Sequence, residues 1–311
     1  MENPFSRILL PVDKSENSKK AIKFLSSLLI FFEDKNIELT LLNVVPLESI
    51  SEKIKNVDFR LVMIQDKIFA EKIIEEYIKE NIMPFLDDYE RHIKSIGFLG
   101  SIKKQVEIGD PGNKIIEIST NQDIKTVMLA RRVMSKFKKI ILGSVSEKIL
   151  YGLLNQNIYI IGQKISEENP IGNILIPVDG SEYSKKAVEH VVSLTKVVKN
   201  IKRIDILRII NVSFYLERVR QGIDPEIEAE EILSESKRKF INEGVSPELI
   251  VTKSIIGFPK DEIIKVIKEG SYDLIVMGRK GRSAIKDMVL GGVSSTVLNN
   301  CFDQTVAIIN Q

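Results

Sequence analysis

The chain contains the same stretch of sequence twice. Residues 8–21 and 174–187 are identical at 11 of 14 positions, and each begins with an apolar run that ends in Pro-Val-Asp. A second match lies near the end of each half, where Gly143-Ser-Val-Ser corresponds to Gly291-Gly-Val-Ser. The offset is 166 residues at the front and 148 at the back, so the first copy carries 18 extra residues in its middle. This pattern indicates tandem duplication of a whole domain rather than a short solenoid repeat.

Length and composition agree with two domains. The 311 residues are 43% hydrophobic, enough for two ordinary cores at roughly 150 residues per domain. We place the domains at residues 1–165 and 171–311, divided by a polar, turn-like segment at residues 166–172. The 45 basic and 43 acidic side chains nearly cancel, so bulk charge gives no argument for a nucleic-acid or membrane partner.

Targeting signals and cysteine usage indicate a cytoplasmic protein. The amino terminus lacks a basic segment followed by an apolar one. The longest strongly apolar stretch, residues 24–32, is far short of the roughly 20 residues that a membrane span needs. Cys301 is the only cysteine, which excludes an intrachain disulfide and favours a reducing compartment.

Each half alternates apolar strands with helices. The expected strands are residues 8–12, 39–45, 102–107, 125–129 and 158–161, then 174–178, 204–212, 249–255, 273–277 and 305–309. Middle helical sections are expected at about 61–95 and 225–243. This alternation indicates βαβ units with right-handed crossovers. We therefore predict an α/β fold of two tandem, doubly wound, parallel five-stranded sheets that are Rossmann-like. Ligands of such sheets bind beyond the carboxyl ends of the strands.

The last strand of each half is apolar and matches its counterpart in the other half. Residues 157–161 and 305–309 would be aggregation-prone at exposed sheet edges. We therefore predict that these strands pair with each other and give the chain a pseudo-twofold axis. Such a chain would mimic a two-subunit dimer, and it leaves open whether two chains also form a homodimer.

A glycine-rich basic loop follows the fourth strand of the second half. It begins Gly-Arg-Lys-Gly at residue 278 and leads to Gly-Gly-Val-Ser at residues 291–294, the start of an expected short helix. Glycine lets the backbone approach a ligand closely, and free N–H groups at a helix start attract an anion. Arg279, Lys280 and Arg282 add positive charge. The alternative is a solvated basic turn, but the rest of the chain favours an anion site that suits phosphate.

These motifs together resemble the universal stress protein family. They are Pro-Val-Asp at the end of the first strand, Gly-x-Pro before the third helix, and Gly278-x-x-Gly281 followed, after nine intervening residues, by Gly291. The resemblance covers nearly the whole chain twice and identifies it as a tandem two-domain member. It implies strand order 3-2-1-4-5 in each sheet and an adenine nucleotide between the first and fourth strands, in a stress-response protein with an unknown protein partner.

The resemblance also implies which residues hold the nucleotide. They come from the strand ends and the glycine loop: Pro177, Val178, Asp179, Val212, Met277, Gly278, Arg279, Gly281, Gly291, Gly292, Val293 and Ser294. Within this set Val212, at the end of the second strand, would face the adenine, and the glycine loop would hold the phosphates. The cofactor would be ATP, ADP or AMP, and Mg²⁺ could accompany it.

Two departures from the family pattern bear on the ligand. Gly292 stands where the family has Ser or Thr, so one hydroxyl to a terminal phosphate is missing, and AMP or ADP stay alternatives to ATP. In the first half Ala130 and Val133 replace the two leading glycines, although Gly143 and Ser144 are retained. A β-branched valine disfavours positive φ and blocks close approach. We therefore predict one adenine nucleotide per chain, bound in the second half.

Other candidate groups favour binding over catalysis. His92 and His190 have no evident partners, and Cys301 is expected to be a buried apolar residue. Asp13 is expected to stabilise the helix that follows it, and Asp179 could do this or contact a ligand. No general base, P-loop lysine or metal site is evident, so efficient ATP hydrolysis is not predicted. The alternatives left open are an interaction scaffold that binds no nucleotide and an ATP-using enzyme of a related fold.

Overall fold

The computed structural model describes residues 3–32, 36–53, 67–131, 143–166, 169–281 and 290–310. In the first half its strands are β1 (Arg7–Pro11), β2 (Glu38–Val45), β3 (Ser101–Ile108), β4 (Thr126–Ala130) and β5 (Asn157–Ile161). The helices of that half are α1 (Glu16–Leu29), α2 (Leu47–Lys53), α4 (Lys67–Tyr77), the π-helical turn η1 (Ile78–Ile82), α5 (Met83–Ser95), α6 (Pro111–Asn121) and α7 (Ser144–Gly152).

The second half repeats this alternation. Its strands are β6 (Asn173–Val178), β7 (Arg203–Asn211), β8 (Ile250–Gly257), β9 (Leu274–Gly278) and β10 (Thr305–Ile309). The helices are α8 (Glu182–Val197), α9 (Val212–Arg220), α10 (Pro225–Asn242), the 3₁₀ turn η2 (Pro247–Leu249), α11 (Pro259–Glu269) and α12 (Gly292–Asn300).

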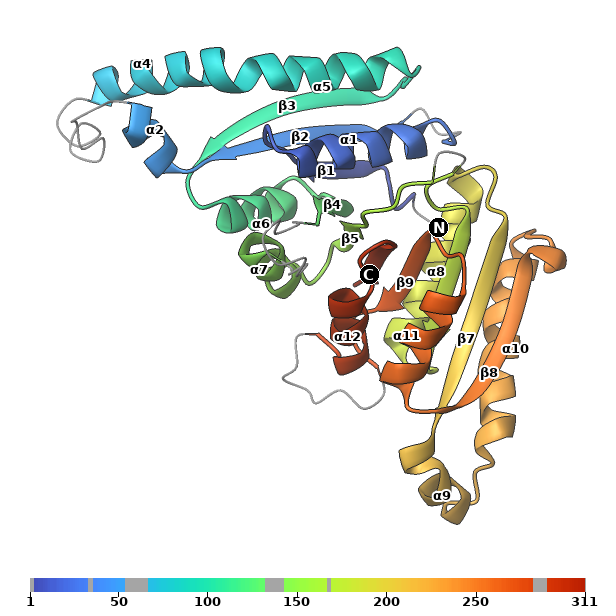
Figure 1. Cartoon of the computed structure of the whole chain (residues 1–311). Coiled ribbons are helices and arrows are strands. Elements are labelled where there is room, and N and C mark those ends of the chain that lie inside the picture. The colour runs from blue at the N-terminus through green and yellow to red at the C-terminus, as the bar shows by residue number, and fades with distance from the viewer. Residues whose placement is uncertain are drawn as a thin grey trace.

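All ten of these strands form one sheet. Its order is β3-β2-β1-β4-β5-β10-β9-β6-β7-β8, so each half has the predicted order 3-2-1-4-5. Strands within each half are parallel. One core, on the face covered by α1, α5, α8 and α10, is separated by the sheet from a second core beneath α6, α7, α11 and α12 (Figure 1). The predicted doubly wound α/β architecture is confirmed.

The two halves are joined through their last strands, as predicted. Strands β5 and β10 pair antiparallel, with Tyr159 opposite Ala307, and every residue of both strands is buried. Beside this junction the Tyr159 hydroxyl contacts Nε2 of His190 on α8 at 2.6 Å. Burial lowers the pKa of His190 to about 3, so the ring is neutral near pH 7. His190 is therefore an interdomain packing residue.

The duplicated Pro-Val-Asp-x-Ser segment is a strand exit and a helix cap. Ser15 precedes α1 and its hydroxyl accepts the Ser18 N–H, and Ser181 caps α8 in the same way. In the first half Oδ1 of Asp13 accepts the N–H of Ser15 at 2.9 Å. Asp179 accepts the N–H of Ser181 at 2.9 Å. The expected structural role of Asp13 is confirmed, and Asp179 shares it.

Two helices, α2 and α9, were not predicted from the sequence. The second strand of the second half was expected to run to Val212, but β7 ends at Asn211, whose Oδ1 accepts the N–H of Ser213 at 3.0 Å and so starts α9. No residue of α9 is buried.

Cys301 is buried, as predicted. Among the described residues, no helix is both long enough and apolar enough to cross a lipid bilayer.

Candidate functional site

A cavity of about 470 Å³ opens at the carboxyl ends of β6, β7 and β9. The chain moves outward from β6 to β7 and β8, then returns to β9 on the other side of β6. The strand order reverses at this point, which is where open α/β sheets bind their ligands. The cavity therefore lies at the place that the topology favours for a ligand.

Ten of the twelve residues named from the sequence line this cavity. They are Pro177, Val178, Asp179, Met277, Gly278, Gly281, Gly291, Gly292, Val293 and Ser294. They come from the ends of β6 and β9, the loop after β9, and the first turn of α12. The structure thus brings together segments that lie about a hundred residues apart in the sequence.

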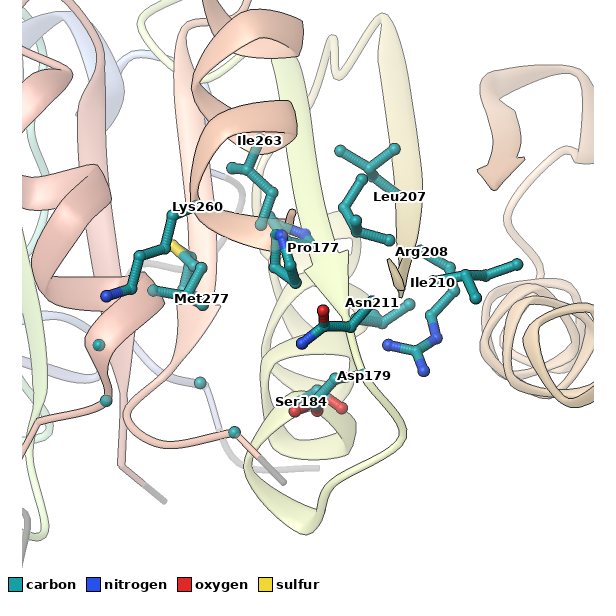
Figure 2. Close-up of a pocket in the computed structure, with 18 of the residues that line it drawn as sticks. Pro177, Asp179, Ser184, Leu207, Arg208, Ile210, Asn211, Lys260, Ile263 and Met277 are labelled. Atoms are coloured by element: carbon teal, nitrogen blue, oxygen red, sulfur yellow. The ribbon is translucent and has the colours of Figure 1, made fainter. Parts of the chain in front are cut away.

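Val212 does not line the cavity and is corrected. It is the first residue of α9, with 42% of its surface exposed, because the strand ends one residue before it. The end of β7 instead contributes Ile210 and Asn211 (Figure 2). Apolar side chains of Pro177 and Ile263 also line the cavity, and such side chains suit the flat, apolar faces of an aromatic base.

The glycines of the loop serve two different purposes. A Cβ placed on Gly281 would lie 2.6 Å from Oδ2 of Asp179, inside the cavity lining. A Cβ on Gly278 would instead lie 2.4 Å from the backbone oxygen of Tyr183 on α8. Gly278 is therefore needed for close packing of α8 against β9, whereas Gly281 keeps the cavity open beside Asp179.

The amino end of α12 faces the cavity without a side-chain cap. Gly291 is the N-cap residue and has no side chain that could accept the first N–H groups of the helix. The Ser294 hydroxyl donates to the carbonyl of Gly278 at 2.9 Å, so it ties the helix to the end of β9. The first turn of α12 thus presents backbone N–H groups and the positive end of the helix dipole, which attract an anion.

Lys260 is a cavity residue that the sequence analysis missed. It lies in the first turn of α11 and lines the cavity beside the first turn of α12. Its Nζ lies 3.5 Å from the position of a Cβ placed on Gly292. The ammonium group therefore occupies the region toward which a serine or threonine at position 292 would project. Its place directly after the Gly-x-Pro motif was the available signal.

Arg279 does not point into the cavity, and its predicted role in holding phosphate is wrong for the side chain. It is 3% exposed and donates from Nη1 to the carbonyl of Leu153 at 2.7 Å and to Oδ1 of Asn310 at 3.0 Å. Nη2 donates to the carbonyl of Leu150. Burial lowers the pKa of Arg279. Arg282, the third cation of the loop, lies outside the described residues.

Helix α9 covers the outer side of the cavity. It is connected to α10 by a hydrogen bond and an ion pair. Its Phe214, Tyr215 and Arg218 line the cavity. The Tyr215 hydroxyl donates to Glu226 at 2.9 Å, and Arg218 pairs with Glu228.

Among the described residues, no cluster of three or more His, Cys, Asp or Glu side chains could hold a metal ion.

Comparison with known proteins gives a consistent result. A family model described as the universal stress protein family matches residues 4–152 and 170–308. A universal stress protein of Methanocaldococcus jannaschii is 29% identical over 160 residues, covering 49% of this chain and 91% of that protein. Universal stress protein YxiE of Bacillus subtilis is 32% identical over 143 residues, covering 41% of this chain and 93% of that protein.

A solved structure resembles the whole chain. The crystal structure of a universal stress protein from Archaeoglobus fulgidus matches with a TM-score of 0.68 and 22% identity, and 98% of each chain is covered. At this level of identity the likeness shows the fold, including the presence of both halves in one chain.

Proposed function

We infer the function from one premise, which is that this chain belongs to the universal stress protein family. We propose that it is a regulatory protein of the stress response that binds one adenine nucleotide, ATP, ADP or AMP, in its second half. The observation that carries the proposal is the cavity at the strand switch point, with an apolar wall on one side and the uncapped amino end of α12 on the other.

The lining supports a definite orientation of the nucleotide. The adenosine would lie against Pro177, Ile210 and Ile263, because these side chains provide the apolar wall. The phosphates would lie at the first turn of α12, where backbone N–H groups and Lys260 meet. Asp179 would be near the ribose, between these two ends of the cavity.

Lys260 supports a phosphate-rich ligand despite the missing hydroxyl at position 292. An ammonium group is a strong partner for a phosphate because its hydrogen bonds are charge-assisted. We propose that ATP or ADP binds more tightly than AMP for this reason. A Mg²⁺ ion, where one is bound, would be held mainly by the phosphates. A cytoplasmic location and an unidentified protein partner also belong to this proposal.

The test is calorimetry of the full chain with ATP, ADP and AMP, with GTP as a control for base selectivity. We expect one site per chain and tighter binding of adenine than of guanine nucleotides. No binding of any of them would favour the interaction scaffold. Two equivalent sites would contradict the assignment to the second half alone. Release of phosphate from ATP above background would favour the enzyme alternative.

A further inference from the structure

Arg279 belongs to the nucleotide loop by sequence, but its side chain reaches the other half of the chain. Leu150 and Leu153, whose carbonyls accept its hydrogen bonds, lie at the end of α7 in the first half. Leu153 is the C-cap residue of that helix. A buried guanidinium at this place satisfies carbonyls that the helix leaves without intrahelical partners and complements the negative end of its dipole.

The backbone of Arg279 also forms hydrogen bonds with β10 and with the start of α12. Its N–H donates to the carbonyl of Ile309 on β10 at 3.2 Å, and its carbonyl accepts the N–H of Gly291 at 2.9 Å. Gly291 is the N-cap of α12. One residue therefore links the first half, the last strand, and the end of α12 that faces the cavity.

The first half contains the matching arginine with a smaller role. Arg131 directly follows β4, is 2% exposed, and donates from Nη1 to the carbonyl of Leu298 in the last turn of α12 at 2.7 Å. Its guanidinium also lies over the ring of Phe302, 5.3 Å from the centroid. Each half thus inserts an arginine from its fourth-strand exit into the end of the final helix of the other half, as the pseudo-twofold arrangement requires.

From these contacts we propose that Arg279 is a positioning residue for the nucleotide site, so that the first half holds residues 279–281 and the amino end of α12 in their binding geometry. The inference rests on the proposed function. A loop fixed before the ligand arrives loses less conformational freedom on binding, and affinity rises accordingly. Because coupling is reciprocal, a nucleotide bound at the loop must also strengthen the contact between Arg279 and α7.

The test compares two buried interdomain arginines in the full chain. Arg279→Met removes the anchor of the loop, and Arg131→Met is the matched control, because it removes an interdomain hydrogen bond without touching residues 278–281. Both variants should unfold at lower temperature than the wild type. We expect Arg279→Met to raise the Kd for ADP at least tenfold, while Arg131→Met changes it by less than twofold.

A conservative variant and a second readout separate positioning from general destabilisation. Arg279→Lys keeps the cation but cannot reach all three acceptors, so its Kd should lie between those of the wild type and Arg279→Met. Amide hydrogen exchange at residues 279–281 should be faster in Arg279→Met than in Arg131→Met without ligand. On addition of ADP, exchange at residues 149–153 should slow in the wild type and not in Arg279→Met.

The possible failures are distinguishable. Equal Kd values for Arg279→Met and Arg131→Met would overturn the positioning role, although the proposed function would stand. A wild-type chain that binds no nucleotide would overturn the proposed function. In that case loop exchange that is the same in both variants would overturn the anchoring by Arg279, and faster exchange in Arg279→Met alone would support it.

Discussion

The two halves have the same frame but different residues at the carboxyl ends of their strands. In the second half Lys260 of α11 reaches the cavity beside the first turn of α12. In the first half the matching position is Gly112, and a Cβ there would lie 2.5 Å from Cδ of Lys148 on α7. Lys148 is paired with Asp110 at 2.8 Å. The first half thus has its lysine on α7, where it pairs with a carboxylate, and none at the position that matches Lys260.

The helix that follows the second strand also differs between the two halves: it is packed into the core in the first half and lines the cavity in the second. In the first half Ile50 of α2 is buried in the core. In the second half α9 has no buried residue, and its Phe214 and Tyr215 line the cavity. The comparison teaches that the frame depends on core strands and helix caps that both halves keep, whereas the proposed ligand binding would depend on a few positions at which the two halves differ.

A substitution at Gly281 should have the largest effect on the proposed difference in ligand binding between the two halves. Gly281→Val introduces a side chain whose Cβ lies 2.6 Å from Oδ2 of Asp179, so it should fill the site and displace this carboxylate. The sequence of the first half has a valine at the matching position 133. We expect affinity to fall by about 100-fold, or roughly 3 kcal/mol of binding free energy, from the steric conflict with Asp179 and the loss of phosphate contacts. Calorimetry measures this, and an unchanged thermal midpoint would show that the fold is intact. A variant that binds normally would refute the assignment.

Acid should weaken the junction that holds the two halves together. The folded-state pKa of His190 is about 3 and the unfolded value is roughly 6.5, so only the unfolded chain takes up this proton between those values. Stability from this residue is present above pH 6.5 and is lost as the pH falls toward 3, at up to about 1.4 kcal/mol per pH unit.

Urea unfolding of the wild type and His190→Gln at pH 7 and pH 5 checks this sign. The wild type should lose about 2 kcal/mol more than the variant over this interval. His92→Gln is the matched control, because His92 lies exposed on α5, and it should behave like the wild type. Identical pH dependence in the wild type and His190→Gln would contradict the prediction.

The charge of Lys260 is a further difference between the two halves, and its effect on nucleotide affinity can be measured. Lys260→Met should weaken ATP binding by about tenfold, and AMP binding by less, because the ammonium group would lie beside the outer phosphates. Lys265→Met on the same helix makes the same charge change at an exposed residue that does not line the cavity. It should leave both affinities within about twofold. Equal losses for ATP and AMP in Lys260→Met would contradict this placement of the phosphates.

The smallest expected effect is a gain. Gly292→Ser restores the hydroxyl that the family pattern has, and the added Cβ would lie 3.4 Å from Cε of Lys260, which is ordinary contact. ATP affinity should rise about three- to tenfold, which corresponds to the net contribution of roughly 1 kcal/mol that one ordinary hydrogen bond makes. Gly292→Ala adds the Cβ without the hydroxyl and controls for the lost flexibility. Equal affinities for the Ser and Ala variants would show that the hydroxyl does not reach the phosphates.

Sequence patterns predicted the frame because its causes are local or repeated. Buried strands appear as apolar runs, the Ser15 and Ser181 caps follow Pro-Val-Asp, and the fifth strands match each other. The same patterns could not show where long side chains point. Arg279 was counted with the loop cations because its hydrogen-bond partners lie in the other half of the sequence.

Helix α9 was missed for a different physical reason. The apolar run of β7 continues through Val212, and only the Asn211 side chain, which accepts the N–H of Ser213, marks the change from strand to helix. The predicted role of Val212 failed with that boundary. Lys260 was missed because one lysine in a charged first turn looks solvated unless the opposite wall is known.

The pairing of β5 with β10 also determines which domains pair, because it always joins one first half to one second half. Strand β5 is bonded to β4 and β10, and β10 to β5 and β9, so neither strand can accept a second copy of the chain. Separate domains could combine as two first halves, two second halves, or one of each, in proportions that depend on concentration. Because both halves are covalently joined, the local concentration of the partner stays high at any dilution. The second half, which contains the cavity, is therefore always paired with one first half.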